Sequence, residues 1–322
     1  MRIVIPDDYQ DAVRGLECFG KLAGHEVTVY HDTVTDEDVL AERFKDAEAL
    51  VLIRERTAIS EALLTKLPKL KVIAQTGKGM PHIDLAACTR HGVLVTSGVG
   101  SSEATAELTW ALVLAARRQL PAEVASMKAG KWQSRLGTGL HGRTLGIFGY
   151  GRIGTMVAGF GRAFGMRVLV WGREGSLTRA AADGYETASS QQAFFEQADV
   201  LSLHIKLSKE TTGIVTAADL AVMKPTALLV NTSRAGLIEA GALEAALKAG
   251  RPGMAAVDVY ETEPVVDHPL LHMDNVICTP HIGYVEQDSY ELYFGTAFDR
   301  LLAFIDGHPV EVANMDVVSK KD

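Results

Sequence analysis

The stretch LGIFGYGRIG, residues 145–154, is the most informative part of this sequence for the fold. Its first four residues form a short apolar run that predicts a strand, and a helical pattern follows as far as Phe164. In the GxGxxG turn between them, Gly149 permits a tight turn, Gly151 lets a pyrophosphate approach the backbone, and Gly154 lets helix and strand pack closely. The segment therefore predicts a dinucleotide site at a helix N-terminus. The backbone positions expected to bind the phosphates are Gly149, Gly151, Arg152, Ile153 and Gly154.

The same alternation of strand and helix patterns extends along the chain on both sides of this stretch. Short apolar segments before it lie at residues 3–5, 26–30, 49–53, 70–75 and 93–96. A second set lies at residues 145–148, 167–171, 200–204, 227–231, 254–257 and 275–278. Longer helical patterns cover Ser101–Arg118 and Val285–Ile305. Since strands that alternate with helices form parallel sheets covered on both faces, the sequence predicts an α/β protein with two doubly wound parallel-sheet units.

The composition excludes several function classes. The chain has 322 residues, with 32 Lys and Arg against 40 Asp and Glu, and a formal net charge of −8. This balance argues against a nucleic-acid partner, which requires a basic surface. The longest clean apolar run, Trp110–Ala116, is too short to span a membrane. With three scattered cysteines and no leader pattern, we expect no metal site, no disulfide framework and a cytoplasmic location.

The residues after the next strand bear on the choice between NAD and NADP. An acidic residue that binds the ribose hydroxyls is expected about 20 positions after the glycine turn. The strand at Val168–Trp171 is followed instead by Gly172, Arg173 and Glu174. Without the acid nothing repels a 2′-phosphate, and Arg173 could pair with that group. The sequence leans toward NADP, although Glu174 could bind the ribose and Arg173 could face only solvent.

Three polar segments follow strands of the second set. They are Asn231–Gly236, Asp258–Pro264 and Cys278–Gly283. In an open parallel sheet, ligands bind outside the carboxyl ends of the strands. These segments are therefore expected to converge on one site.

The chain resembles the D-isomer-specific 2-hydroxyacid dehydrogenases, most plainly from Leu70 to His281. The resemblance implies hydride transfer between a nicotinamide, NADH or NADPH, and a small 2-oxo or 2-hydroxy acid. The family's catalytic residues correspond to Arg234, Glu263 and His281. The motifs that carry the resemblance occur in the family's order: Gly77–Gly79, 149–154, Asn231–Gly236, Asp258–Pro264 and 280–283.

The chemistry of these three side chains fits such a reaction. Reducing a 2-oxo acid requires a hydride at carbon and a proton at oxygen, and histidine is a common proton donor near neutral pH. Glu263 would stabilise the protonated ring of His281 and fix its orientation. Arg234 would hold the substrate carboxylate and polarise the carbonyl through its fork of donors. Taken singly, each residue type more often has a structural or surface role, so the case depends on the three occurring together.

Further cofactor contacts are implied by the resemblance. Asp258 corresponds to the residue that hydrogen-bonds the nicotinamide carboxamide, with a strand-end cap as the alternative. Thr105 corresponds to a residue at the nicotinamide end, and Thr232 belongs to a segment that contacts the cofactor. His204 lies near the adenine and its ribose in the family, but Lys206 replaces the usual proline two positions later.

The first unit supplies candidate substrate contacts. Gln75–Gly79 resembles the loop whose backbone amides receive the substrate carboxylate, so Gly79 is a candidate there. Lys78 occupies a position that is commonly small or neutral in the family. Arg54 follows a strand at a place where it could meet a substrate phosphate. Both cations could equally contact only solvent.

The resemblance also implies the organisation of the molecule and the alternatives for its function. A flavodoxin-like substrate domain would comprise residues 1–100 and 290–322, and a Rossmann NAD(P)-binding domain residues 101–289, in a homodimer. The first expectation is an enzyme like D-3-phosphoglycerate dehydrogenase. The alternative is an NADPH-preferring glyoxylate or hydroxypyruvate reductase. A non-catalytic, corepressor-like protein that senses nicotinamide cofactors is the alternative from another class.

Overall fold

The computed structural model describes residues 1–317, which form two compact units. Unit 1 contains Met1–Ser101 and the segment that begins at Glu286. Unit 2 is Ser102–Val285. Residues 318–322 of the expected substrate domain lie outside the described residues. Which unit binds substrate and which binds cofactor stays a prediction at this point.

Unit 1 is built on a parallel sheet with the strand order β2-β1-β3-β4-β5. Its central strands are buried along their whole length, as expected when helices cover both faces of a parallel sheet. The strands are β1 (Arg2–Ile5), β2 (Glu26–Val29), β3 (Ala49–Leu52), β4 (Val72–Gln75) and β5 (Leu94–Thr96).

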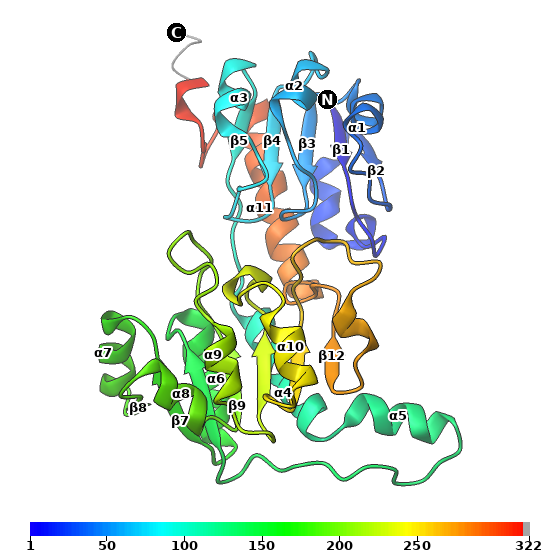
Figure 1. Ribbon diagram of the computed structural model, residues 1–322. Coiled ribbons are helices and arrows are strands. Elements are labelled where there is room, and N and C mark those ends of the chain that lie inside the picture. Colours follow the sequence, from blue (N-terminus) through cyan, green and yellow to red (C-terminus); the bar gives the residue numbers. More distant parts are fainter. Residues whose placement is uncertain (318–322) are drawn as a thin grey trace. The chain divides into compact units, whose positions relative to one another are not determined.

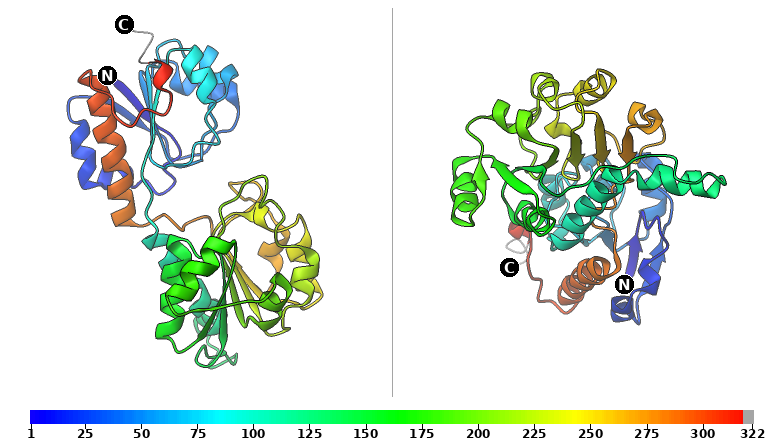
Figure 2. Two further views of the ribbon diagram at one scale, coloured as in Figure 1. Left: turned by 90° about the vertical axis from the view of Figure 1, so that its left-hand side faces the viewer. Right: turned by 90° about the horizontal axis from the view of Figure 1, so that it is seen from below.

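Helices cover both faces of this sheet (Figure 2, left). The N-cap residues Asp36, Ser60 and Asp84 begin the helices of one face by accepting hydrogen bonds from free backbone N–H groups. Those helices are α1 (Glu37–Phe44), α2 (Glu61–Thr65) and α3 (Leu85–Arg90). The other face contacts α11 (Gln287–Ile305), which also packs on the 3₁₀ helix Glu17–Leu22. Unit 1 is therefore completed by a helix that comes late in the sequence.

Unit 2 has a parallel seven-stranded sheet with the order β12-β11-β10-β9-β6-β7-β8. The chain runs outward from β6 to β8, returns to β9 beside β6, and then runs outward in the other direction. The strand order thus reverses between β6 and β9, and ligands bind at such a switch point in doubly wound sheets. The strands are β6 (Thr144–Phe148), β7 (Arg167–Trp171), β8 (Glu186–Thr187), β9 (Val200–Leu203), β10 (Leu228–Asn231), β11 (Met254–Val257) and β12 (Val276–Cys278).

Two apolar clusters, one on each face, form the core of unit 2. One cluster includes side chains of α4 (Glu103–Arg117) and α6 (Arg152–Ala163), together with Ala180 of α7 (Glu174–Ala182). The other includes side chains of α8 (Gln191–Gln197), α9 (Ala217–Ala221) and α10 (Ala242–Lys248). These layers hold the carboxyl ends of the strands at one edge (Figure 1).

Helix α5 (Leu120–Lys128) differs from the other helices of unit 2, because none of its residues is buried. With the loop that follows it, α5 extends from the rest of the unit (Figure 1). Large apolar side chains are exposed along this arm, which we define as residues 120–136. Trp132 is 76% exposed and Leu136 is 96% exposed.

The predicted α/β class with two parallel sheets is confirmed. The short edge strand β8 was not expected from the sequence, because both of its residues are exposed and carry no apolar pattern. Helix α5 was not expected as a separate element either. Within residues 1–317, no helix is both long enough and apolar enough to cross a membrane.

Candidate active site

The glycine turn between β6 and α6 has the geometry that a dinucleotide phosphate requires. Gly149 has φ +98°, and a Cβ there would lie 2.7 Å from the carbonyl oxygen of His204. A Cβ at Gly154 would lie 2.2 Å from the carbonyl oxygen of Gly149, so only glycine lets α6 begin this close to the turn. A Cβ at Gly151 would meet nothing within 4 Å, which leaves open space beside the first turn of the helix. These residues fit a dinucleotide pyrophosphate.

The end of β7 lies directly beside this turn. The backbone N–H of Gly149 donates to the carbonyl oxygen of Trp171 over 2.8 Å, so Gly172 and Arg173 follow next to the glycines. Arg173 is the exposed N-cap residue of α7. Later in α7, Arg179 donates through Nη2 to the carbonyl oxygen of Tyr150 over 2.8 Å. Sequence reasoning missed Arg179, because its relation to the turn depends on how α7 packs.

His204 follows β9 on the other side of the switch point. Burial lowers the pKa of this histidine to about 4, so its ring is neutral. The Nε2 atom is buried and has no hydrogen-bond partner among the described residues. A buried polar atom without a partner is unusual and is satisfied when a ligand supplies one. Lys206, two residues on, is exposed.

Glu263 and His281 form the central pair of the site. The Nδ1 atom of His281 lies 2.5 Å from Oε2 of Glu263, and the backbone N–H of Tyr260 donates to Oε1 over 3.0 Å. Burial raises the pKa of Glu263, but the hydrogen bond and charge of His281, the Tyr260 N–H and the Arg234 charge outweigh it and hold the pKa below its usual value. Glu263 is therefore ionised at neutral pH and orients the His281 ring, which packs edge-on against Tyr284.

The segment that carries His281 is held by Asp258. This carboxylate is fully buried and accepts hydrogen bonds from the Thr279 hydroxyl over 2.7 Å and from the backbone N–H groups of Ile282 and Gly283 over 2.8 Å each. Burial raises the pKa of Asp258 and outweighs these hydrogen bonds, which act in the opposite direction. The contacts match the strand-end cap that was the alternative for this residue. Asp258 thus holds the Thr279 side chain before His281 and the backbone immediately after His281.

Arg234 is positioned by the loop after β10. The side chain of Asn231 accepts from the Ser233 N–H and donates to the carbonyl oxygen of Arg234. The Ser233 hydroxyl donates to the carbonyl oxygen of Ile205 over 2.7 Å, which ties the loop to the segment after β9. Because the charge of Arg234 contributes to the low pKa of Glu263, all three predicted catalytic residues belong to one electrostatic group.

Threonines of α4 connect this group to the body of unit 2. Thr105 donates to the carbonyl oxygen of Gly283 over 2.8 Å, and the hydroxyls of Thr109 and Thr232 lie 2.7 Å apart. The predicted cofactor residues Thr105 and Thr232 therefore lie within one network. Thr109 was missed from the sequence, although its spacing of four from Thr105 places both on one helix face.

The predicted substrate residues lie together in unit 1. The side-chain amide of Gln75 donates to the carbonyl oxygens of Arg54 and Gly79, over 2.8 and 3.0 Å, so it joins the segments after β3 and β4. A Cβ at Gly77 would lie 2.8 Å from Nη1 of Arg54, and the Arg54 guanidinium also lies over the ring of Tyr293. Lys78 and Gly79 are exposed. Sequence analysis placed Gln75 in this loop without recognising that it holds the loop together.

The residues predicted for the cofactor and for catalysis thus lie in one unit, and the residues predicted for the substrate lie in the other. The glycine turn, the strand-end segments and the Arg234–Glu263–His281 group belong to unit 2, whereas Arg54, Lys78 and Gly79 belong to unit 1. Within unit 2, the Glu263 carboxylate contacts and orients the ring of His281.

Comparisons with known proteins agree with this geometry. The family model described as "D-isomer specific 2-hydroxyacid dehydrogenase, NAD binding domain" matches residues 110–283. A D-3-phosphoglycerate dehydrogenase of Methanocaldococcus jannaschii is 37% identical over 98% of this chain, which spans 60% of that protein. A glyoxylate reductase of Aeropyrum pernix is also 37% identical, over 87% of each chain.

Solved structures share this fold. An oxidoreductase structure from Ralstonia solanacearum is 56% identical with a TM-score of 0.96 over 98% of both chains. A phosphoglycerate oxidoreductase from Vibrio cholerae is 54% identical with a TM-score of 0.93, over 95% of this chain and 99% of that one. The chain therefore belongs to the D-isomer-specific 2-hydroxyacid dehydrogenases, a family of nicotinamide-dependent oxidoreductases, as its motifs predicted.

Proposed function

We propose that this chain interconverts a D-2-hydroxy acid and the corresponding 2-oxo acid, with His281 as the general acid and base. The observation that carries the proposal is the 2.5 Å contact between His281 and Glu263 beside the Arg234 charge. Because Glu263 is ionised and bonded to Nδ1, the other ring nitrogen of His281 is the atom that gives the proton to the carbonyl oxygen or takes it from the hydroxyl. Arg234 holds the substrate carboxylate and draws electron density from the carbonyl.

The proposal includes the residues that hold the nicotinamide cofactor. The backbone from Gly149 to Gly154 binds the pyrophosphate, and the unpartnered Nε2 of His204 faces the adenosine part. Thr105, Thr232 and Asp258 lie toward the nicotinamide end. When bound, the cofactor supplies the hydride. The task of Asp258 within the protein is to hold the His281 segment, through the Ile282 and Gly283 N–H groups.

We further propose that NADPH is the preferred cofactor. Gly172 leaves the end of β7 without a carboxylate, and Arg173 is exposed one residue later. Arg179, which contacts the Tyr150 carbonyl, adds a second cation on α7 beside the glycine turn. The negative charge of Glu174, which is also exposed at the start of α7, acts against this preference. Two arginines against one glutamate favour a 2′-phosphate on balance.

D-3-phosphoglycerate is the substrate that we propose first. Arg54 and Lys78 provide two cations in the segments that Gln75 joins, and a phosphorylated acid carries the charge that suits them. Glu55 lies in the same place, since its carboxylate would be 2.9 Å from a Cβ at Gly79, and it offsets part of this positive charge. An unphosphorylated acid such as glyoxylate or hydroxypyruvate is therefore the second candidate.

We also propose that a second copy of the chain covers the arm. Leu120, Val124 and Met127 on α5, followed by Trp132 and Leu136, leave a run of large apolar side chains exposed. Several large exposed apolar side chains on one segment are typical of protein interfaces. The cytoplasmic location expected from the sequence stays a prediction.

The test of the activity is an initial-rate panel. NADH and NADPH oxidation is followed by absorbance with glyoxylate, hydroxypyruvate, pyruvate and 3-phosphohydroxypyruvate in parallel. We expect the highest kcat/KM with 3-phosphohydroxypyruvate and NADPH. Relative to the wild type, Arg54→Ala should raise KM for 3-phosphohydroxypyruvate more than it raises KM for glyoxylate. A preference for an unphosphorylated acid would select the second candidate. No turnover with any acid, although both cofactors bind, would contradict the dehydrogenase proposal and favour the nicotinamide sensor.

A further inference from the structure

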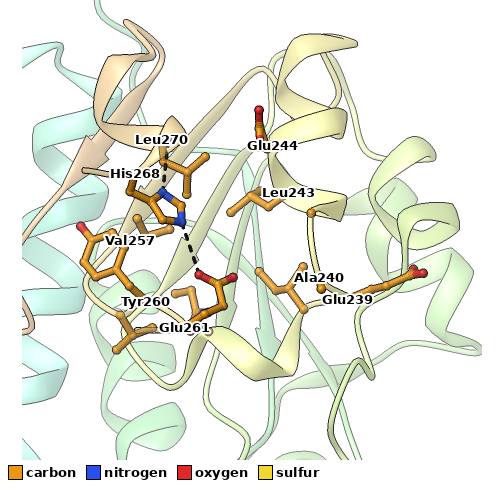
Figure 3. Close-up of a pocket in the computed structure, with 14 residues that line it drawn as sticks. Glu239, Ala240, Leu243, Glu244, Val257, Tyr260, Glu261, His268 and Leu270 are labelled. Atoms are coloured by element: carbon orange, nitrogen blue, oxygen red, sulfur yellow. Dashed lines mark hydrogen bonds and ion pairs between the residues drawn. The ribbon is translucent and has the colours of Figure 1, made fainter. Parts of the chain in front are cut away.

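A pocket of about 300 Å³ lies in unit 2, next to the loops that position Arg234 and Glu263. It is formed by the segment before and at the start of α10, the residues after β11, and the 3₁₀ helix Pro269–His272 (Figure 3). Leu243, Val257 and Leu270 give it an apolar lining. Arg234, Glu263 and His281 do not line it. The pocket is therefore distinct from the proposed catalytic group.

The charged side chains that line this pocket are all acidic. They are Glu239, Glu244 and Glu261, and neither lysine nor arginine is among the lining residues. Glu239 accepts from the Ala217 N–H, and Glu244 pairs with Lys248 outside the pocket. In Figure 3 the Glu239 side chain points away from the centre, whereas the Glu261 carboxylate points inward. Glu261 is thus the carboxylate that a ligand in the pocket would meet.

His268 contacts only one oxygen of the Glu261 carboxylate. Its Nδ1 accepts a hydrogen bond from the Leu270 N–H over 3.2 Å, which leaves the ring hydrogen of a neutral histidine on Nε2. Nε2 lies 3.3 Å from Oε2 of Glu261, so the ring contacts one carboxylate oxygen and leaves the other, Oε1, for a ligand. The pocket accordingly combines an apolar lining with one inward carboxylate.

We propose that this pocket binds a small organic ammonium ion with an apolar body. The apolar body packs against Leu243, Val257 and Leu270, and the ammonium group donates to Glu261. Ligand pockets of this kind are mostly apolar, with a few polar groups that set orientation and selectivity. A hydrogen bond between an ammonium group and a carboxylate is among the stronger kinds, so it determines which charge type is accepted.

The pocket shares residues with the loops that position the catalytic group. Tyr260 lines the pocket, and its backbone N–H donates to Glu263 over 3.0 Å. Asn231 also lines it, and its side chain holds the carbonyl oxygen of Arg234 over 3.0 Å. An occupied pocket therefore acts on the positions of Glu263 and Arg234 through these two residues. This regulatory part of the inference rests on the proposed function, whereas the binding part does not.

Binding is tested on the full chain with three probes of matched shape. 2-Phenylethylammonium, neutral 2-phenylethanol and phenylacetate are titrated separately, and binding is followed by saturation-transfer NMR and calorimetry. We expect the ammonium to bind about fivefold tighter than the alcohol, the size of effect expected for a partly exposed ion pair, and the carboxylate to bind weakest. Equal affinity for the three probes, or the tightest binding by phenylacetate, would overturn the proposal.

Two alanines on the surface of unit 2 provide a matched pair of variants. Ala240 lines the pocket and is exposed, so Ala240→Trp should fill its mouth without disturbing the core. Ala245, exposed on α10 and not among the lining residues, gives Ala245→Trp as the control. We expect about tenfold weaker ammonium binding in Ala240→Trp, no change in Ala245→Trp, and loss of the ammonium preference in Glu261→Gln. Equally weakened ammonium binding in Ala240→Trp and Ala245→Trp would contradict the proposal that the ammonium binds in this pocket.

Regulation is read out separately from binding. In the wild type, saturating 2-phenylethylammonium should change KM for the 2-oxo acid at least about twofold, and Ala240→Trp should abolish this change. Unaltered kinetics at a concentration that NMR shows to be saturating would refute the link to Glu263 and Arg234. If the chain turned over no acid, the proposed function would fail, while the binding titrations would still decide the pocket.

Discussion

At the residue scale, His281 occupies an unusual backbone position as well as a central chemical one. Its φ of 50° lies in the left-handed region, which asparagine tolerates better than most other residues. We therefore pair His281→Ala with His281→Asn, which removes the proton donor and keeps the backbone conformation. Both variants should lower kcat by about 10² or more, because general acid catalysis is typically worth that much.

The measurement for these variants is steady-state kinetics together with cofactor titration by fluorescence. Cofactor affinity should stay close to that of the wild type, since the glycine turn is untouched. A wild-type kcat in His281→Asn would remove the role that we assign to His281. Loss of cofactor binding in both variants would show that the residue supports structure instead.

Arg173 carries the second residue-scale prediction. As the exposed N-cap of α7 next to the glycine turn, it should contact a 2′-phosphate but no part of NADH. Arg173→Ala should raise the Kd for NADPH about tenfold and leave the Kd for NADH unchanged, because one charge-assisted contact is lost. Arg162, on the last turn of α6, provides the control Arg162→Ala. Equal losses for both cofactors would contradict the phosphate contact.

At the scale of the element, two of the three glycines of α6, Gly154 and Gly159, should respond in opposite ways to substitution. A Cβ at Gly154 would lie 2.2 Å from the Gly149 carbonyl oxygen, whereas a Cβ at Gly159 would meet nothing within 4 Å. Gly154→Ala should therefore displace the start of α6, destabilise the protein and weaken cofactor binding. Gly159→Ala should stabilise it by about 0.5–1 kcal/mol, the usual helix preference for alanine. Urea unfolding and cofactor titration measure both effects. A Gly154→Ala variant that is stable and binds the cofactor tightly would show that the backbone of the turn can move to accommodate a Cβ.

Asp199 connects the beginnings of three strands and makes the stability of unit 2 depend on pH. Its carboxylate accepts from the Thr144 N–H over 2.8 Å and from Lys224 over 2.9 Å. Burial raises the pKa of Asp199, but these hydrogen bonds outweigh it and hold the pKa below the ordinary 3.8. A carboxyl with a depressed native pKa stabilises the fold above its unfolded pKa, and this contribution is lost as pH falls through the native value.

Asp199→Asn should therefore lower the free energy of unfolding by about 1–3 kcal/mol at pH 7, the range for hydrogen bonds to charged groups. The difference from the wild type should stay constant down to about pH 5 and shrink below about pH 4. Denaturant unfolding at several pH values checks both statements. A difference that grew toward low pH would have the wrong sign for an ionised Asp199.

The helices and strands show which features can be predicted from residues close together in the sequence. Strands such as β6 and β9 are fully buried, so their apolar runs predict them well. The GxGxxG turn also depends on nearby residues, and its glycines are required by contacts within a few residues or with the adjacent His204. Strand β8 has exposed polar residues and gave no signal.

The rest of the site depends on contacts between distant segments. The spacing of Asp258 from Gly283 does not indicate that one carboxylate binds the backbone beside His281. Likewise, Arg179 reaches the Tyr150 carbonyl only because α7 packs beside the glycine turn. The sequence could thus nominate candidate site residues, whereas the contacts that hold them in place became visible with the structure.

At the scale of the whole molecule, the arm at residues 120–136 bears on assembly. Val124 is exposed on α5, and Val266 is exposed elsewhere in unit 2. If a second copy covers the arm, Val124→Asp should convert a dimer to monomers, because burying an unpaired carboxylate in an interface is costly. Val266→Asp should leave the dimer intact. Sedimentation velocity distinguishes the cases, and a monomeric wild type would contradict the dimer.

The division of unit 1 between the two ends of the sequence also bears on its synthesis. Residues 1–101 emerge from the ribosome before residues 102–305, but one face of their sheet is covered by α11, residues 287–305. Domains generally fold as units and in order from the N-terminus. Here residues 102–285 are complete before α11 exists, so the second unit along the chain is the first that can finish folding. Until then, the nascent sheet of unit 1 leaves the apolar surface that contacts α11 open to the cell's chaperones.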